Sequence, residues 1–127
     1  MDEQPESIVH LCQQQAWELA QAAGEYRPKS LEEVGFIHCS RPEQILEVAN
    51  NFFPGQHGLV VLWIDHQRVQ PEIRWEPSDG DVYPHIYGPL NLEAVRAVQD
   101  FTPDIDGFFR RMPGGSLITR MGPWEFP

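Results

Sequence analysis

Three histidines of this chain lie in short apolar segments, where a titratable ring is uncommon. They are His10 in Ile8–Cys12, His38 in Gly35–Ser40 and His85 in His85–Gly88. An imidazole can act as a general acid or base, hold a ligand by hydrogen bonds or coordinate a metal ion. Burying such a ring costs free energy unless a partner satisfies it. Each position therefore predicts either a hydrogen-bonded structural histidine or a functional one.

Side-chain alternation along a strand gives these histidines a related orientation. Each shares a face with the residues two positions away, which are Ile8 and Cys12 for His10, Phe36 and Ser40 for His38, and Tyr87 for His85. If the aliphatic positions of these strands face the core and the three strands are neighbours, all three histidines lie on the other side of one sheet. The remaining histidines, His57 and His66, occur in polar segments and are expected to be structural or to face solvent.

Two further features can contribute to a site. Glu76 directly follows an expected strand, Glu72–Trp75, and its carboxylate can act as a base or accept a hydrogen bond from a sugar hydroxyl. The stretch Tyr83–Leu90 (YPHIYGPL) combines two tyrosines, a histidine and two prolines. It suits the wall of a pocket and equally suits an edge strand that closes a core.

Common catalytic and nucleotide-binding motifs are absent from the chain. It contains no GxGxxG, GxxxxGK[ST], GxSxG or HExxH sequence. The two cysteines, Cys12 and Cys39, form no CxxC pair, and we expect both to be small buried side chains. Cys39 and His38 are neighbours in an expected strand, so their side chains point apart and do not form a nucleophile–base pair.

The elements that position these residues indicate an α+β fold. Strands are expected over residues 8–12, 35–40, 59–64, 72–75 and 85–88, and a helix over 14–23 with Gly24 as its C-terminal cap. Residues 25–34 and 77–82 are expected to be loops, and 92–101 fits either a helical turn or a strand. The continuous apolar run at 59–64 predicts a central strand.

A second helix is expected to follow Ser40. The run Ser40–Glu43 (SRPE) matches a capping box with a proline in the first turn. Its apolar face is formed by residues at i, i+3, i+4 and i+7, which are Ile45, Val48, Ala49 and Phe52. We expect a single domain over residues 1–127, with 8–101 as its core and 102–127 as a peripheral C-terminal extension.

The composition restricts the classes of partner. The formal net charge of the 127 residues is −10, and a surface this acidic repels both phosphate backbones and anionic lipid. Neither nucleic acid nor a membrane is therefore expected as a partner. The acidic, polar N-terminus does not read as a signal peptide, and no apolar run reaches membrane-spanning length. A cytoplasmic location is expected.

The order of these segments resembles a known family. IVH, AWELAQAAGEY, GFIHCS, RPEQILEVANNFF, LVVLWID, RWEP and YPHIYGPL occur in the order seen in the domain of unknown function 952, a family of small, mostly bacterial proteins. The resemblance covers roughly residues 8–101. It implies a fold similar to the ADP-ribosyltransferases, in which small mixed or antiparallel sheets surround a cleft that holds NAD.

The resemblance also implies site residues. His10 matches the first-strand position that holds the dinucleotide, and His38 or Ser40 matches the second-strand position on the nicotinamide side. Glu76 and His85 are both candidates for the third position, because no glutamate lies inside a clearly predicted strand. We therefore expect His38, Glu76 and His85 as catalytic residues and His10, Ser40 and Tyr87 as ligand-binding residues.

Three functions follow as hypotheses. The first is an enzyme or enzyme remnant that binds or acts on NAD or an ADP-ribosylated small molecule, with NAD as the cofactor and no metal. The second is a metal-dependent hydrolase in which His10, His38 and His85 hold a metal and Glu76 is the general base. The third is a non-catalytic module that binds a small ligand, such as a nucleotide, or another molecule, with the histidines forming a polar network under a groove.

Overall fold

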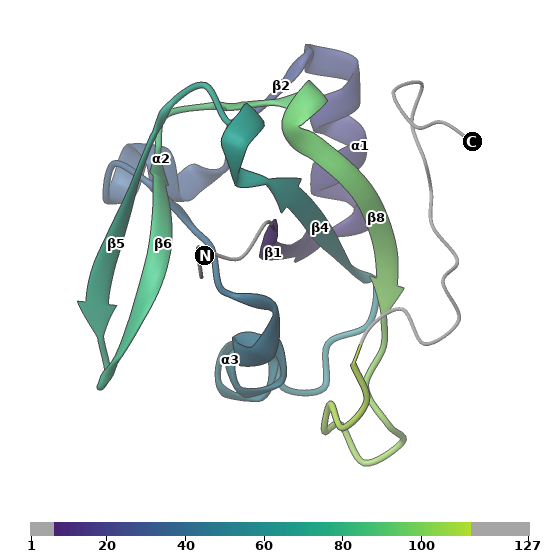
Figure 1. Cartoon of the computed structure of the whole chain (residues 1–127). Coiled ribbons are helices and arrows are strands. Elements are labelled where there is room, and N and C mark those ends of the chain that lie inside the picture. Colours follow the sequence, from purple (N-terminus) through teal and green to yellow (C-terminus); the bar gives the residue numbers. More distant parts are fainter. Residues whose placement is uncertain (1–6, 113–127) are drawn as a thin grey trace.

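The computed structural model describes residues 7–112, which form an α+β arrangement built on three antiparallel sheets (Figure 1). The first sheet has the order β1-β4-β8, with β1 at Ser7–Gln13, β4 at Leu59–Asp65 and β8 at Val95–Phe101. The second pairs β2, Glu25–Tyr26, with β7, Leu90–Asn91. The third has the order β3-β6-β5, with β3 at Ile37–His38, β6 at Asp81–Tyr87 and β5 at Glu72–Ser78.

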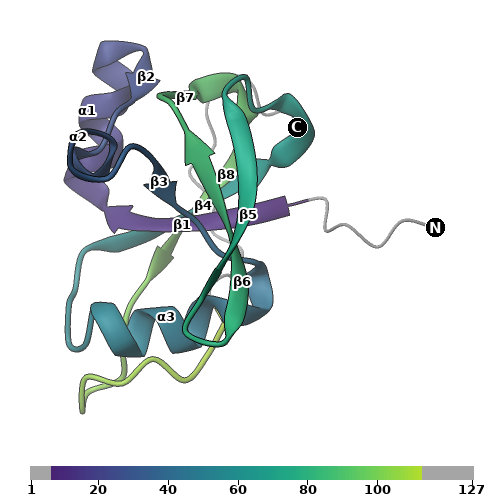
Figure 2. The same cartoon turned by 90° about the vertical axis from the view of Figure 1, so that its left-hand side faces the viewer.

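Three α-helices connect these strands (Figure 2). They are α1, Gln14–Ala23, α2, Lys29–Glu33, and α3, Ile45–Phe52, and three short 3₁₀ turns lie at Pro42–Gln44, His66–Arg68 and Leu92–Ala94. The prediction for α1 is confirmed at both ends, and Gly24 caps it with a φ of 91°, a conformation that costs glycine little. None of the described helices is long and apolar enough to span a membrane.

The central strand β4 separates two hydrophobic clusters. Val60, Leu62 and Ile64 pack with α1 and with the core faces of the other two sheets. Leu59 and Val61 point to the opposite side and pack with Ile45 and Ala49 of α3, which are 1% and 0% exposed. Because both faces of β4 are covered, its sequence is continuously apolar, and its prediction as a central strand is confirmed.

Several predicted boundaries are wrong. The strand expected at 35–40 narrows to Ile37–His38, followed by a single bridge from Ser40 to Val9 of β1. The loop expected at 25–34 contains β2 and α2, so the chain has one more early helix than predicted. The ambiguous segment 92–101 divides into a 3₁₀ turn and β8.

The polar loop expected at 77–82 is a tight hairpin. Strands β5 and β6 pair up to Ser78 and Asp81, which leaves only Asp79 and Gly80 in the turn. Both have positive φ, at 51° and 84°, as a two-residue turn that matches strand twist requires. The proline, the glycine and the two aspartates that suggested a loop are therefore accommodated within a twisted hairpin.

The helix cap also differs from the prediction. Arg41, not Ser40, precedes the 3₁₀ turn that leads into α3. The backbone N–H of Arg41 donates a hydrogen bond to the Gln44 side chain at 2.8 Å. The backbone of Ser40 exchanges two hydrogen bonds with Val9, each 2.8 Å long. Ser40 is thus held by the first sheet and cannot begin the helix.

The segment after β8 contributes to the second cluster. Phe109 is 2% exposed, and its backbone N–H and carbonyl are both bound by the Asn50 side chain, at 2.7 and 2.9 Å. The expected C-terminal extension therefore supplies core packing in its described part. The rest of the expected extension, which contains Trp124 and Phe126, lies outside the described residues.

Candidate functional site

The third sheet brings two of the three histidines together. His38 of β3 pairs directly with His85 of β6, and their rings meet edge to face with centroids 5.6 Å apart. The ring of Phe36 stacks on His85 with a centroid distance of 4.1 Å. His10 does not share this sheet, because β1 pairs only with β4 in the first sheet.

His10 instead connects the first sheet to the other two, because it bonds to His38 in β3 and to Tyr26 in β2. Its Nδ1–H donates to the His38 carbonyl at 2.5 Å, so its Nε2 accepts a hydrogen bond from the Tyr26 hydroxyl at 2.7 Å. Because a carbonyl oxygen can only accept, the proton of the neutral ring is on Nδ1 and not on Nε2. Burial lowers the pKa of His10 from 6.5 to about 4. With both ring nitrogens in use, His10 can offer a ligand only the surface of its ring.

The two cysteines are buried thiols, as expected. Burial raises the pKa of Cys12 to about 12, while its hydrogen bond with Tyr26 has a smaller opposing effect. Burial also raises the pKa of Cys39. A thiol that does not ionise is a poor nucleophile, so neither cysteine has the environment of a reactive one.

Glu76 lies inside strand β5, where it orients His85. Its Oε1 accepts a hydrogen bond from Nδ1 of His85 at 2.7 Å, and Tyr87 donates to the same carboxylate at 2.8 and 3.0 Å. The bonds from His85 and then Tyr87 hold the pKa of Glu76 below its usual range. The Arg74 guanidinium lies 4.2 Å from the centroid of the Tyr87 ring. The expectation that no glutamate lies in a strand at this position is thus wrong.

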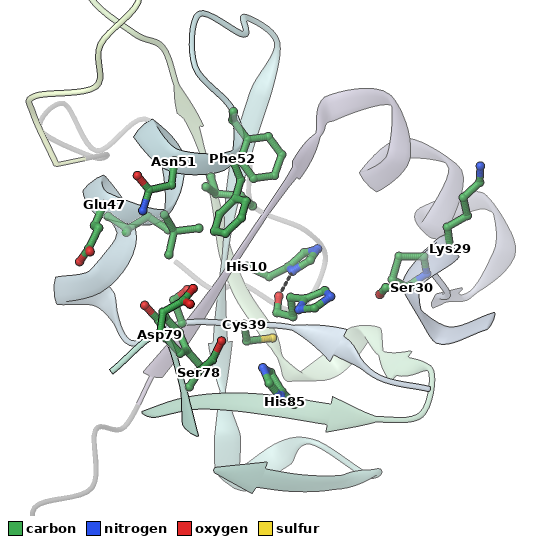
Figure 3. Close-up of a pocket in the computed structure, with 18 of the residues that line it drawn as sticks. His10, Lys29, Ser30, Cys39, Glu47, Asn51, Phe52, Ser78, Asp79 and His85 are labelled. Atoms are coloured by element: carbon green, nitrogen blue, oxygen red, sulfur yellow. Dashed lines mark hydrogen bonds between the residues drawn. The ribbon is translucent and has the colours of Figure 1, made fainter. Parts of the chain in front are cut away.

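A cavity of about 510 Å³ lies between this sheet and α3 (Figure 3). His10, His38, Ser40 and His85 are among its lining residues, whereas Glu76 and Tyr87 are not. The structure thus separates the six predicted site residues into four that line the cavity and two that support His85 from outside it. Nε2 of His85 has no hydrogen-bond partner within residues 7–112, which leaves it available to a ligand.

The opposite wall was not predicted to be part of a site. It consists of residues of α3 and the residue after it. Four are apolar, namely Ile45, Val48, Phe52 and Phe53, and two are polar, namely Glu47 and Asn51. The helical spacing placed Phe52 in the core, but it is 64% exposed. Tyr83 also lines the cavity, and it belongs to the aromatic stretch Tyr83–Leu90 that was interpreted as a possible pocket wall.

A polar clasp joins the two walls. Asp81, at the start of β6, accepts hydrogen bonds from Arg41 at 3.2 Å and from Gln44 at 2.9 Å. Gln44 also donates to the Val82 carbonyl at 3.1 Å, although it is itself 4% exposed. The clasp therefore connects the end of the β5–β6 hairpin to the beginning of α3.

The metal hypothesis finds no geometric support in the described chain. No group of three histidine, cysteine, aspartate or glutamate side chains among residues 7–112 is placed to hold a metal ion. His10, which that hypothesis needs as a ligand, uses both nitrogens for His38 and Tyr26.

Together the fold and the cavity define a small α+β protein with paired imidazoles on one wall of a pocket and an aromatic helix on the other. The family model described as "Protein of unknown function (DUF952)" matches residues 11–98. The chain belongs to this family.

Solved structures of one relative are similar to this chain. The crystal structure of protein CC0527 from Caulobacter crescentus is 32% identical, with a TM-score of 0.75, and the match covers 82% of this chain and 93% of that one. Its solution NMR structure is also 32% identical, with a TM-score of 0.72, over 83% of this chain and 92% of that one. No curated protein has significant similarity to the chain.

Proposed function

We propose that this protein binds NAD or an ADP-ribosylated small molecule in the cavity and that His85 is its proton-transfer group. The observation that carries the proposal is the arrangement around His85. Glu76 accepts the Nδ1–H at 2.7 Å, and the other nitrogen is left for a ligand in the cavity. A carboxylate in this position orients the imidazole and stabilises the positive charge that forms when Nε2 takes up a proton.

The size and lining of the cavity support a small organic ligand. Its volume of about 510 Å³ lies within the roughly 300–1,000 Å³ of typical small-molecule pockets. Apolar side chains of α3 face a few polar groups of the sheet, a combination that binds a ring and fixes its orientation. The resemblance to ADP-ribosyltransferases supports the choice of NAD and is part of the proposal.

The reaction that suits this arrangement is cleavage of the bond between nicotinamide and ribose. Water attacks C1′ of the ribose, the C1′–N bond breaks, and its electron pair stays on the leaving nicotinamide, which becomes neutral. Nε2 of His85 takes the proton that the water loses as the new C1′–O bond forms. In this proposal His38, which lines the same cavity, binds a ribose hydroxyl.

This proposal changes the role of two predicted residues. Glu76 was expected to stabilise the ribose charge directly, but its carboxylate binds His85 and Tyr87 and does not line the cavity. We assign it the role of positioning His85. Tyr87, expected to contact the ligand, secures Glu76 in turn, and Ser40 contributes to the cavity wall.

The experiment combines ligand binding with turnover. The purified protein is titrated with NAD and ADP-ribose in a thermal-shift assay and incubated with NAD while nicotinamide release is followed. We expect stabilisation by both ligands and slow release of nicotinamide. Absence of binding and of release at millimolar NAD contradicts the proposal.

Glu76→Gln tests the positioning role. It keeps the shape of the side chain but removes the charge, and we expect nicotinamide release to fall by about tenfold or more, with NAD binding changed much less. Glu18→Gln is the matched control, because Glu18 is an exposed carboxylate on α1 and lies outside the cavity lining. Binding without release in the unaltered protein would favour the non-catalytic module instead.

A further inference from the structure

The helical wall of the cavity exposes an aromatic ring that the fold does not need for its core. Phe52 is 64% exposed at the end of α3, whereas Ile45 and Ala49 of the same helix are buried. Figure 3 shows Phe52 across the cavity from His85, with His10 and Cys39 between them. A large aromatic side chain exposed on a concave surface is typical of a place where a ligand makes contact.

Two polar groups on the sheet side of the cavity offer one donor and one acceptor. Burial, followed by the charges of Glu47, Asp81 and Asp79, raises the pKa of Tyr83. Its hydroxyl therefore stays protonated and can donate a hydrogen bond. Nε2 of His85 is an acceptor while Glu76 holds Nδ1–H.

The charges around the cavity disfavour an anion. Glu47 and Asp79 line it, against one cation, Lys29. Burial lowers the pKa of His10 to about 4, so this ring is neutral near pH 7. Burial, followed by the nearby His85, also lowers the pKa of His38. The balance of fixed charge in the lining is thus negative near neutral pH.

From these observations we infer that the cavity is a site for a planar heteroaromatic ring, uncharged or cationic, that stacks on Phe52 and turns its polar edge towards the sheet wall formed by Tyr83, His38 and His85. Stacking on Phe52 supplies contact area, and Tyr83 and His85 supply one donor and one acceptor for the ring edge. The inference rests on the proposed function in that it uses the same cavity. It goes further because the negative lining disfavours a diphosphate inside the cavity. The diphosphate of a bound dinucleotide would therefore lie at the rim of the cavity.

Three probes of nearly equal shape test the charge preference. Nicotinamide is neutral, 1-methylnicotinamide is a cation and nicotinate is an anion, and the binding of each to the full chain is measured by titration calorimetry. We expect the neutral and cationic probes to bind and nicotinate to bind about fivefold more weakly, as fits partly screened charges. Glu47→Gln should narrow the gap between cation and anion.

Phe52→Ala tests the ring contact. Because Phe52 is exposed, the substitution should leave folding intact and weaken nicotinamide binding by about tenfold. Leu19→Ala is the matched control, since Leu19 is also exposed on a helix but lies outside the cavity lining. Nicotinate binding as tightly as the other probes, or affinity unchanged in Phe52→Ala, overturns the inference.

The two proposals fail separately. Binding of ADP-ribose that nicotinamide cannot compete with, together with no binding of nicotinamide itself, overturns the ring site and leaves the proposed function in place. Nicotinamide binding that depends on Phe52, without binding of NAD or ADP-ribose, supports the ring site and overturns the proposed function.

Discussion

His10 should make the stability of this protein sensitive to mild acid. Its pKa is lowered from 6.5 to about 4 in the folded state, mainly by burial. Between these values the unfolded chain binds a proton at His10 and the folded chain does not, so stability present above pH 6.5 is lost as the pH falls toward 4. The difference between the two pKa values corresponds to about 3 kcal/mol of unfolding free energy.

The test compares the unaltered protein with His10→Gln by urea denaturation across this pH range. The variant loses the hydrogen bonds to His38 and Tyr26, so it should be less stable at pH 7, by about 1–3 kcal/mol. It no longer carries the titrating ring, so the stability difference between the two proteins should change by about 3 kcal/mol in favour of the variant from pH 7 to pH 4. At pH 4 the variant should therefore be as stable as the unaltered protein, or more stable. His57→Gln, in an exposed loop, is the control and should follow the unaltered protein. A gap that stays constant with pH refutes the reasoning.

Three further substitutions test the packing described above. Tyr26→Phe removes the hydroxyl that donates to His10, and should cost about 1–2 kcal/mol in denaturant unfolding; no loss would show that this bond is not stabilising. Phe109→Ala removes a ring 2% exposed in the second cluster and should cost about 3–5 kcal/mol, whereas a change below 1 kcal/mol would mean that the segment is not docked. Gly80→Ala places a side chain at a φ of 84° and should lower the melting temperature by a few degrees, about 1 kcal/mol; an unchanged melting temperature contradicts the turn geometry.

The sequence predicted best those elements whose patterns are local. The run of good helix formers before Gly24 predicted α1. The unbroken apolar run at 59–64 predicted β4 as a central strand, and both of its faces are covered. The proximity of His38 and His85 needed more than alternation, because alternation specifies a face within one strand and not the neighbouring strand. For the same reason His10 was expected beside them, although β1 belongs to another sheet.

The helical wall of the cavity was missed because spacing alone cannot show where a core ends. Phe52 continues the apolar face begun by Ile45, but it lies beyond the buried part of α3 and meets the cavity. Glu76 was interpreted as a group following a strand because Pro77 and the two aspartates after it resembled a loop. The hairpin extends past it to Ser78, and this register brings its carboxylate to His85.

The clasp of Arg41, Gln44 and Asp81 has a consequence for how a ligand enters. It ties the hairpin end to the start of α3, so both sides of the cavity are held at a fixed separation before any ligand arrives. Binding then requires little ordering of the protein, and less of the interaction free energy is lost to entropy. Asp81→Asn should weaken this tie, and the expected result is weaker binding of any ligand of the cavity with a less favourable binding entropy.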